Sequence, residues 1–218
     1  MNQSYAQKCL DAAGALLSRP QDSIGYLRTL PSWKKQPLDY ALPWYSFASI
    51  DWIERHIKPA HRVFEYGGGG STLFYAQRAL TVTVAESHAG WASVIQKSAQ
   101  VEGYSNVNVI LHELGDHNAA SFKNHPFFHC IEQGAPWDVI SVDCFCCFET
   151  GGLGGALRPY ALSLAQSHLA PGGFIILDDS WLYSAELKGC LGWTVRDFAS
   201  LGPSRYGLTS TAILTRES

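Results

Sequence analysis

The chain has 218 residues, of which 46% are hydrophobic and 16% are charged. A charged fraction below the roughly 25% of a typical soluble chain, together with this apolar content, excludes intrinsic disorder. The formal net charge is −3 and there is no basic run, so we expect no nucleic acid among the partners. No uncharged stretch is apolar enough to cross a bilayer, and we expect no membrane partner.

The cysteines and the first residues bear on the compartment. A chain of this size can form a core without disulfide bonds, so we expect reduced thiols. Lys8 and Asp11 interrupt the apolar run of residues 1–20, which is atypical of a signal peptide. The sequence therefore predicts a cytoplasmic protein. The six cysteines are Cys9, Cys130, Cys144, Cys146, Cys147 and Cys190.

The N-terminal quarter has helical patterns. A capping box of Ser4 and Gln7 precedes apolar residues at helical spacing, and this first helix ends at Pro20. Prolines and aromatic residues between 21 and 44 predict an ordered but irregular connection. Ser46 opens a second helix that ends before Pro59. We expect a single domain over 1–218, in which 1–58 form a helical extension and 59–218 the core.

From residue 61 the sequence alternates between short apolar runs and helical segments, as in a parallel sheet covered by helices. The last two alternating segments, joined by a Gly-Pro turn, predict a hairpin at the C-terminus. The predicted strands are Arg62–Tyr66, Thr81–Glu86, Val107–Leu111, Asp138–Asp143, Phe174–Asp178, Thr194–Ser200 and Leu208–Thr215. The predicted helices are Ser71–Ala79, Ala89–Val101 and Arg158–Leu169, with Pro159 in the first turn of the last.

The first predicted strand runs into a helix through the glycines at 67–70. Such a turn lets a ligand approach the main chain closely. A dinucleotide fingerprint would need glycine where Thr72 or Leu73 stands, which weakens the case for a nicotinamide cofactor. The glycine loop also has no lysine, which excludes a P-loop. Glu65 two residues before the turn favours a cationic ligand, and S-adenosylmethionine fits.

Acidic residues end three further strands. Glu86 lies 19 residues after Gly67, the interval at which a carboxylate accepts hydrogen bonds from ribose hydroxyls, although a solvated acid at a strand end would look the same. Asp143 ends the fourth predicted strand, Asp178 and Asp179 end the fifth, and all three should converge at the same sheet edge. Three acids this close together require either a cation or a proton. Mg²⁺ is the candidate cation. If a proton is bound instead, Asp143 or Asp179 is the candidate general base.

Aromatic residues and thiols flank these strand ends. Trp44 and Tyr45, together with Trp181 and Tyr183, could form the wall of an acceptor site or simply pack in the core. Cys144, Cys146 and Cys147 lack the paired spacing of a zinc site, and we expect small thiols beside a pocket. The glycine-rich segment 150–155 fits a lid or an ordinary loop equally well.

The combination of these motifs resembles the class I S-adenosylmethionine-dependent methyltransferases, closest to small O-methyltransferase-like members. The resemblance runs from about Pro43 to the C-terminus. It rests on Pro43–Ser46, on Phe64–Gly67 through Thr72, on Asp138–Asp143, and on Leu169–Gly173 leading to Leu177–Asp179. It implies a Rossmann-like α/β fold with a seven-stranded, mostly parallel sheet in the order 3-2-1-4-5-7-6, strand 7 antiparallel and helices on both faces.

The resemblance also implies specific contacts. The cofactor contacts would be Glu65, Gly67, Gly69 and Glu86, with Asp116 or His117 near the adenine and Asp143 facing the cofactor or substrate. Ser71 takes the place of the third glycine of the fullest family loop. In the catechol and caffeoyl-coenzyme A O-methyltransferases a divalent metal is held by acids placed like Asp143, Asp178 and Asp179.

We therefore expect methyl transfer from S-adenosylmethionine to an oxygen, or less favourably a nitrogen, of a small molecule. Two alternatives stay open from the sequence. One is an aminopropyltransferase-like or NAD-dependent enzyme on a similar sheet, and the other is a non-catalytic module that binds S-adenosylmethionine. The sequence does not decide between a monomer and a homodimer.

Overall fold

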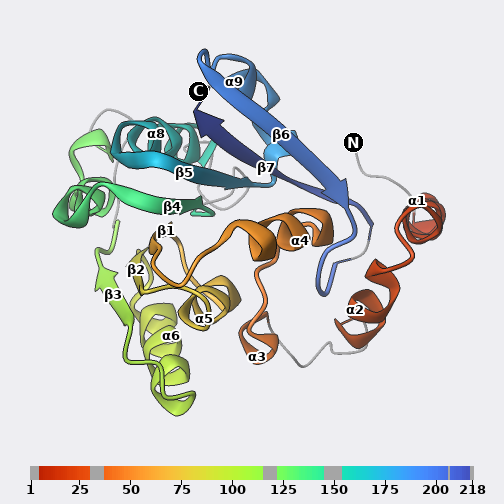
Figure 1. The fold of residues 1–218 in the computed structure, drawn as a ribbon, viewed down its shortest axis with the longest axis horizontal. Coiled ribbons are helices and arrows are strands. Elements are labelled where there is room, and N and C mark those ends of the chain that lie inside the picture. The colour runs from red at the N-terminus through yellow and green to blue at the C-terminus, as the bar shows by residue number, and fades with distance from the viewer. Residues whose placement is uncertain (1–4, 30–36, 115–121, 145–153, 206, 217–218) are drawn as a thin grey trace.

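The computed structural model describes residues 5–29, 37–114, 122–144, 154–205 and 207–216. Figure 1 shows a twisted sheet with helices packed along it. The strands are β1 (Arg62–Tyr66), β2 (Thr81–Glu86), β3 (Val107–Leu111), β4 (Trp137–Val142), β5 (Leu169–Asp178), β6 (Trp193–Ser200) and β7 (Thr209–Arg216). The helices are α1 (Tyr5–Ser18), α2 (Asp22–Thr29), α3 (Pro37–Tyr40), α4 (Phe47–His56), α5 (Gly70–Ala76), α6 (Ala89–Val101), α7 (Pro126–His129), α8 (Gly154–His168) and α9 (Ser184–Lys188), with short 3-10 turns η1 (Phe122–Asn124), η2 (Cys130–Gly134) and η3 (Ser180–Leu182).

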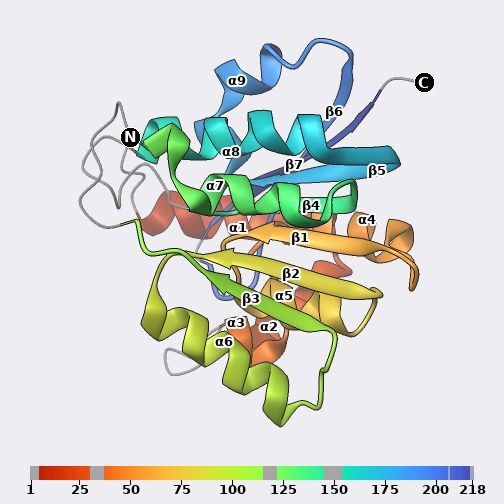
Figure 2. The ribbon, with the colours of Figure 1, turned by 90° about the vertical axis from the view of Figure 1, so that its left-hand side faces the viewer.

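The sheet has seven strands in the order β3-β2-β1-β4-β5-β7-β6, which confirms the predicted fold class. Strands β1 to β5 pair in parallel, whereas β7 runs antiparallel to both β5 and β6. The predicted C-terminal hairpin is therefore present. Because β7 is antiparallel, the β6–β7 connection returns to the edge at which the parallel strands end. Figure 2 shows these strand ends gathered along one side of the molecule.

The central strands are buried on both faces, and their successive side chains point to opposite sides of the sheet. In β1, Phe64 and Tyr66 join a cluster with residues of α7 and α8, while Val63 joins a second cluster with residues of α4 and α5. Figure 2 views the sheet from the side covered by α7 and α8. Glu65 points to the α4 and α5 side, so the fold places a carboxylate among core residues.

Two local predictions need correction. The connection 21–44 contains α2 and α3 rather than only irregular chain, because Tyr26 on α2 packs into the core cluster beside α4. Helix α8 begins at Gly154 rather than at residue 158, which places Pro159 inside the helix instead of in its first turn. Leu157 is buried in the same cluster as Ala161, and this packing stabilises the extra turn.

Three further findings concern the cysteines, the length of the helices and the packing of the N-terminal helix. The described cysteines, Cys9, Cys130, Cys144 and Cys190, are free thiols, while Cys146 and Cys147 lie outside the described residues. Within the described ranges no helix is long and apolar enough to span a membrane. Helix α1 packs Ala12, Ala15 and Leu16 against the core cluster that contains α4.

Candidate functional site

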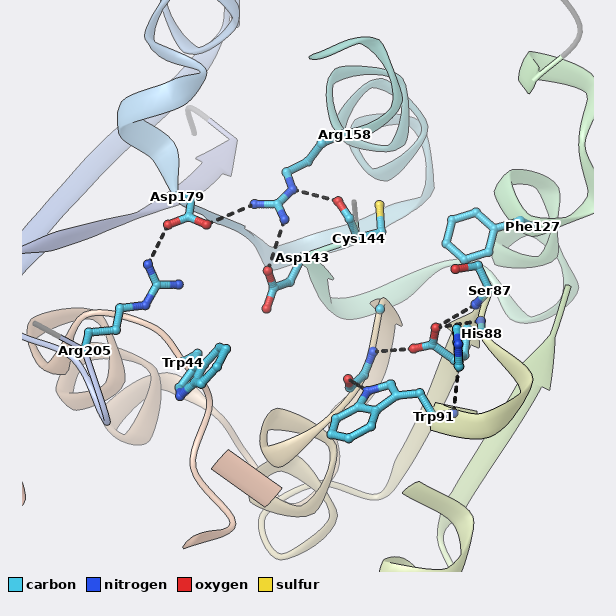
Figure 3. A pocket seen from close by; sticks show the side chains of 13 residues that line it. Trp44, Ser87, His88, Trp91, Phe127, Asp143, Cys144, Arg158, Asp179 and Arg205 are labelled. Atoms are coloured by element: carbon cyan, nitrogen blue, oxygen red, sulfur yellow. Dashed lines mark hydrogen bonds and ion pairs between the residues drawn. The ribbon is translucent and has the colours of Figure 1, made fainter. Parts of the chain in front are cut away.

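A pocket of about 730 Å³ opens at the carboxyl ends of the parallel strands. Figure 3 shows that its lining divides into two ends. His88 and Trp91 lie at one end, Trp44 and Arg205 at the other, and Asp143 with Arg158 between them. Glu86 belongs to the first end, where it accepts a hydrogen bond from His88. The full lining is Trp44, Gly67, Gly68, Glu86, Ser87, His88, Trp91, Phe127, Asp143, Cys144, Arg158, Asp179 and Arg205.

The glycine loop after β1 depends on two residues without a side chain. Gly67 has φ +81°, and a Cβ there would lie 2.9 Å from the backbone oxygen of Asp143. At Gly68 a Cβ would lie 2.5 Å from a methyl carbon of Val84. The indole Nε1 of Trp91 donates to the Gly68 carbonyl oxygen at 2.8 Å. The loop therefore packs closely against Asp143 and Val84 and is hydrogen-bonded to α6 through Trp91. Gly67 and Gly68 themselves line the pocket.

Glu65 lies beneath this loop with no exposed surface. Among the described residues neither of its carboxylate oxygens has a hydrogen-bond partner of acceptable geometry. Burial raises the pKa of Glu65 to about 8, the hydroxyls of Ser71 and Thr72 oppose that shift, and the charges of Asp143 and Glu86 add to it. A buried acid with two unpaired oxygens is costly, and a cationic group near the loop would reduce that cost.

Glu86 ends β2 at the same loop. One carboxylate oxygen accepts from the backbone N–H groups of Ser87 at 2.7 Å and His88 at 3.0 Å, and the other from Gly68 at 3.4 Å. His88 in turn caps α6, because its Nδ1 accepts from the Trp91 N–H. These bonds fix the carboxylate in the pocket wall and leave further acceptor capacity on the oxygen that accepts only from Gly68.

At the centre of the pocket a buried arginine joins the ends of β4 and β5. Arg158 on α8 donates to the carbonyl oxygens of Cys144 at 2.8 Å and Asp178 at 2.9 Å. Its guanidinium also lies 3.3 Å from the Asp143 carboxylate and 3.9 Å from that of Asp179. Burial acts to lower the pKa of Arg158, but the acidic groups around it, Asp143 first among them, together outweigh burial, and the pKa is raised overall. Arg158 is therefore a fixed cation between these acids.

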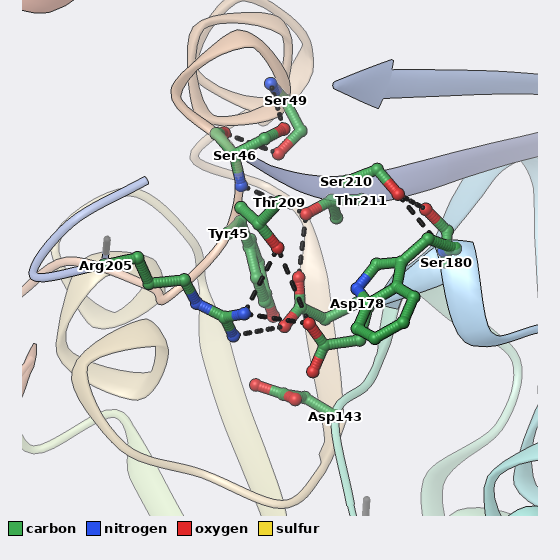
Figure 4. A network of polar contacts seen from close by, with 12 residues as sticks. Tyr45, Ser46, Ser49, Asp143, Asp178, Ser180, Arg205, Thr209, Ser210 and Thr211 are labelled. Carbon is green, nitrogen blue, oxygen red and sulfur yellow. Dashed lines mark hydrogen bonds and ion pairs between the residues drawn. The ribbon is translucent and has the colours of Figure 1, made fainter. Parts of the chain in front are cut away.

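A second arginine meets the acids from the β6–β7 connection. Arg205 lies 2.9 Å from the carboxylate of Asp179 and 3.4 Å from that of Asp178. Figure 4 shows this contact beside Thr211, whose hydroxyl donates to Asp178 at 2.8 Å. Burial, followed by the charges of Asp143 and Asp179, raises the pKa of Asp178 well above its ordinary value, although Arg205 opposes the shift. Asp179 adopts a left-handed backbone with φ 51°, which aims its carboxylate at both arginines.

The three acids do converge as the sequence predicts, but they do not form the expected Mg²⁺ site. Their positive partners are the guanidinium groups of Arg158 and Arg205, and the Asp178 oxygens are already used by Thr211 and Arg205. Within the described parts of the chain no group of three or more potential ligands has a metal-binding arrangement. The acids required a cation, and arginine side chains supply it.

The predicted site residues fall into three groups. Gly67, Glu86, Asp143, Asp179 and Trp44 line the pocket, and Glu65 lies directly below it. Gly69, Ser71, Asp178, Tyr45, Trp181 and Tyr183 are not part of its lining. Asp116 and His117, Cys146 and Cys147, and most of the 150–155 segment lie outside the described residues.

The predicted aromatic wall needs correction. Tyr45 has no exposed surface, and its hydroxyl hydrogen-bonds with that of Ser141 in the core. Tyr183 is buried in the cluster beneath α8, and Trp181 is exposed to solvent away from the pocket. Of the four aromatics, only Trp44 faces the pocket, where the Arg205 guanidinium lies 5.9 Å from the centre of its ring.

Sequence reasoning did not assign Arg158, Arg205, Trp91 or Phe127 to the site. The signal for the two arginines was indirect: three acids at one sheet edge require compensating positive charge. No spacing in the sequence indicates which cations provide it, because the arginines come from a helix and a hairpin connection. Trp91 stands within the pattern of an amphipathic helix, and its polar Nε1 gave no sign of a loop contact.

No family model matches the amino-acid sequence, and a search among curated proteins finds no match. Solved structures do match the fold. A Klebsiella pneumoniae protein assigned as an O-methyltransferase superposes with a TM-score of 0.62 at 15% identity, over 97% of this chain and 100% of the other. A Streptococcus mutans protein assigned as a methyltransferase, in complex with S-adenosylhomocysteine, superposes with a TM-score of 0.56 at 13% identity. The match covers 84% of this chain and 99% of the other. The B. subtilis tRNA methyltransferase TrmK superposes with a TM-score of 0.54 at 11% identity, over 79% of this chain and 67% of the other.

This chain has the class I methyltransferase fold. The sheet order, the antiparallel seventh strand and these matches agree on that point. The acceptors named for such structures differ, since they include rRNA, tRNA and precorrin. The fold therefore does not by itself decide the acceptor, and the expectation that nucleic acid is not a partner rests on composition alone.

The arginine partners lead to a first prediction. Because two guanidinium groups already pair with Asp143, Asp178 and Asp179, Mg²⁺ should bind there too weakly to measure. Titration of the protein with millimolar MgCl₂ in a calorimeter should give no saturable heat, and the melting temperature should stay unchanged. Saturable binding that disappears in Asp178→Asn would contradict the assignment of these acids to arginine.

The burial of Glu65 leads to a second prediction. A carboxyl whose folded pKa is about 8, above an unfolded value near 4.5, contributes stability at low pH that is lost as pH rises through that window. The free energy of unfolding should fall by up to about 1.4 kcal/mol per pH unit between about pH 5 and 8 relative to Glu65→Gln. Urea unfolding of both proteins at several pH values measures this. Parallel pH profiles would mean that Glu65 is ionised throughout.

Proposed function

We propose that this protein transfers the methyl group of S-adenosylmethionine to an oxygen of a small molecule. The observation that carries the proposal is the glycine loop with acids around it: Glu65 beneath, Glu86 beside and Asp143 opposite. Such a surrounding repels a polyphosphate and attracts a cation. The fold match to a protein crystallised with S-adenosylhomocysteine supports the same ligand class.

The Glu86 end of the pocket suits the nucleoside. The carboxylate of Glu86 is already oriented by three backbone donors, and the oxygen that accepts only from Gly68 can also accept from a sugar hydroxyl. Trp91 and His88 stand beside it and give this end an aromatic wall. The negative charge of Asp143 would attract the ammonium end of the ligand to the loop. A cation bound there would also lower the raised pKa of Glu65 and favour its ionised form.

The Trp44 end suits the acceptor. Trp44 presents the face of its ring within the pocket, and Arg205 is fixed beside it by Asp178 and Asp179. A small planar molecule could lie against the indole. The fold match to an assigned O-methyltransferase, which covers almost the whole chain, favours oxygen as the acceptor atom over nitrogen.

S-adenosylmethionine supplies a methyl group already activated by its sulfonium. The chain then has to align the acceptor, exclude water and take up a proton. Asp143 lies between the two ends of the pocket and is partly exposed, so we assign it the role of proton acceptor. Arg158 holds that carboxylate in place, and Asp179, which both arginines restrain, serves as the second candidate base.

Binding of the nucleoside tests the first half of the proposal. Loss of one carboxylate charge at Glu86 removes charge-assisted hydrogen bonds, so Glu86→Gln should weaken S-adenosylmethionine binding by at least about tenfold. Isothermal titration with S-adenosylmethionine, S-adenosylhomocysteine and NAD measures this. Glu102→Gln, an exposed position at the end of α6, is the matched control and should bind normally. Tighter binding of NAD would contradict the cofactor assignment.

Turnover tests the second half. Asp143→Asn keeps the shape of the side chain but removes the base, and should lower kcat by roughly 10²-fold or more, whereas the Kd for S-adenosylmethionine should rise by a smaller factor. Release of S-adenosylhomocysteine is followed with a panel of phenols and alcohols, and amines test nitrogen. Asp39→Asn on α3, where the side chain is exposed, is the control. Binding without product from any acceptor would identify a non-catalytic module.

A further inference from the structure

A second pocket lies at the opposite edge of the sheet, where the parallel strands begin. It has a volume of about 360 Å³ and is bounded by the end of α4, by the start of β5 and by strands β6 and β7. Figure 2 shows the start of β1 and the neighbouring α4 on the side away from the strand ends that carry the candidate site. We call this second cavity the basic pocket, after three side chains that line it: Arg55, Lys58 and Arg196.

The charge of the basic pocket is one-sided. Three permanent cations line it and no carboxylate does. Within the described ranges none of the three forms an ion pair, and the bond recorded for the Arg55 side chain is to the backbone oxygen of Asp51 at 2.9 Å. A chain whose formal net charge is −3 thus gathers unpaired positive charge around one cavity.

The acids nearest to these cations are bound to other partners. On α4, Asp51 pairs with Arg19 at 2.6 Å and Glu54 with Arg78 at 2.8 Å. Next to Arg196, Asp197 accepts from the Ser180 hydroxyl at 2.6 Å. Asp138, which acts on His61, accepts from the backbone N–H of Arg62 at 2.8 Å. Each of these carboxylates is therefore engaged with another partner, and none of them lines the basic pocket.

Neutral donors and a rigid base complete the cavity. The Nδ1 of His61 accepts from the Lys58 backbone N–H at 3.3 Å, which leaves Nε2 as the protonated nitrogen. Burial, opposed by Asp138 and assisted by Lys58, lowers the pKa of His61, so this ring donates in its neutral form. Phe174 and Trp52 pack edge to face at 5.1 Å and form the apolar base.

We propose that the basic pocket binds a small oxyanion, a phosphate or the phosphate group of a small monoester. Cationic side chains and a neutral N–H around one cavity are the donors that recognise such a group. The volume lies at the small end of the range for ligand pockets and leaves room for a short substituent over the aromatic base. The site is separate from the methyl-transfer pocket and does not depend on the function proposed for it.

Calorimetry with inorganic phosphate and with phenyl phosphate tests this proposal, with chloride at matched ionic strength as the reference. We expect saturable binding of both phosphates at one site per chain. Lys58→Ala and Arg196→Ala should each weaken it by about tenfold, since each removes a charge-assisted contact. Lys97→Ala on α6 and Arg28→Ala on α2 remove exposed cations elsewhere and should bind as the unmodified protein does.

Each contrary result has a distinct meaning. If phosphate gives no saturable heat, the proposed site is wrong. It is also wrong if Lys97→Ala weakens phosphate binding as much as Lys58→Ala does. Unchanged binding in the Lys58 and Arg196 variants would place the anion elsewhere, and would also overturn it. A single-stranded RNA oligomer that binds far more tightly than phenyl phosphate would replace the small ligand with a polymer backbone. All four substituted side chains are exposed, so the variants should fold, and circular dichroism verifies this.

Discussion

The neutralisation of clustered carboxylates by two arginines is the constraint on which the candidate site depends. Parallel strands end at one edge, so Asp143, Asp178 and Asp179 arrive together whatever else the chain does. Unpaired, these charges would repel one another in a half-buried place and disfavour the fold. Arg158 and Arg205 meet them from two different elements, and in doing so they fix the ends of β4 and β5 and the connection before β7. The centre and the acceptor end of the pocket are therefore held by the same contacts.

The other end of the pocket shows a different balance. There Glu65 has no guanidinium beside it, and its two oxygens are without hydrogen-bond partners among the described residues. A fold that supplies cations to three acids and leaves a fourth uncompensated concentrates electrostatic cost at one point below the glycine loop. Costs of this kind are characteristic of places where a ligand completes the structure. The contrast between the two ends is the physical reason for placing a cationic nucleoside at the loop.

The two pockets also share a principle. In both, the ligand class follows from which charges the fold has paired and which it has left unpaired. Around Glu65 the unpaired groups are acidic, and around Lys58 and Arg196 they are basic. The net charge of the chain gives no indication of either, because it sums over both. Local charge, rather than composition, therefore decides what each cavity can attract.

The sequence by itself determined the strands, the longer helices between them, the glycine loop, and the acids at the strand ends, because apolar periodicity and glycine spacing are local properties of the chain. The helices α2, α3, α7 and α9 were not predicted. Strand limits were predicted within a few residues, except for β5, which begins earlier at Leu169. Only the tertiary structure decided which cations meet Asp143 and Asp179, that Tyr45 is buried while Trp44 faces the pocket, and that Lys58 and Arg196 share a cavity. These are contacts between residues distant in sequence, and no local pattern encodes the partner of a charge or the direction of a ring once the sheet has assembled.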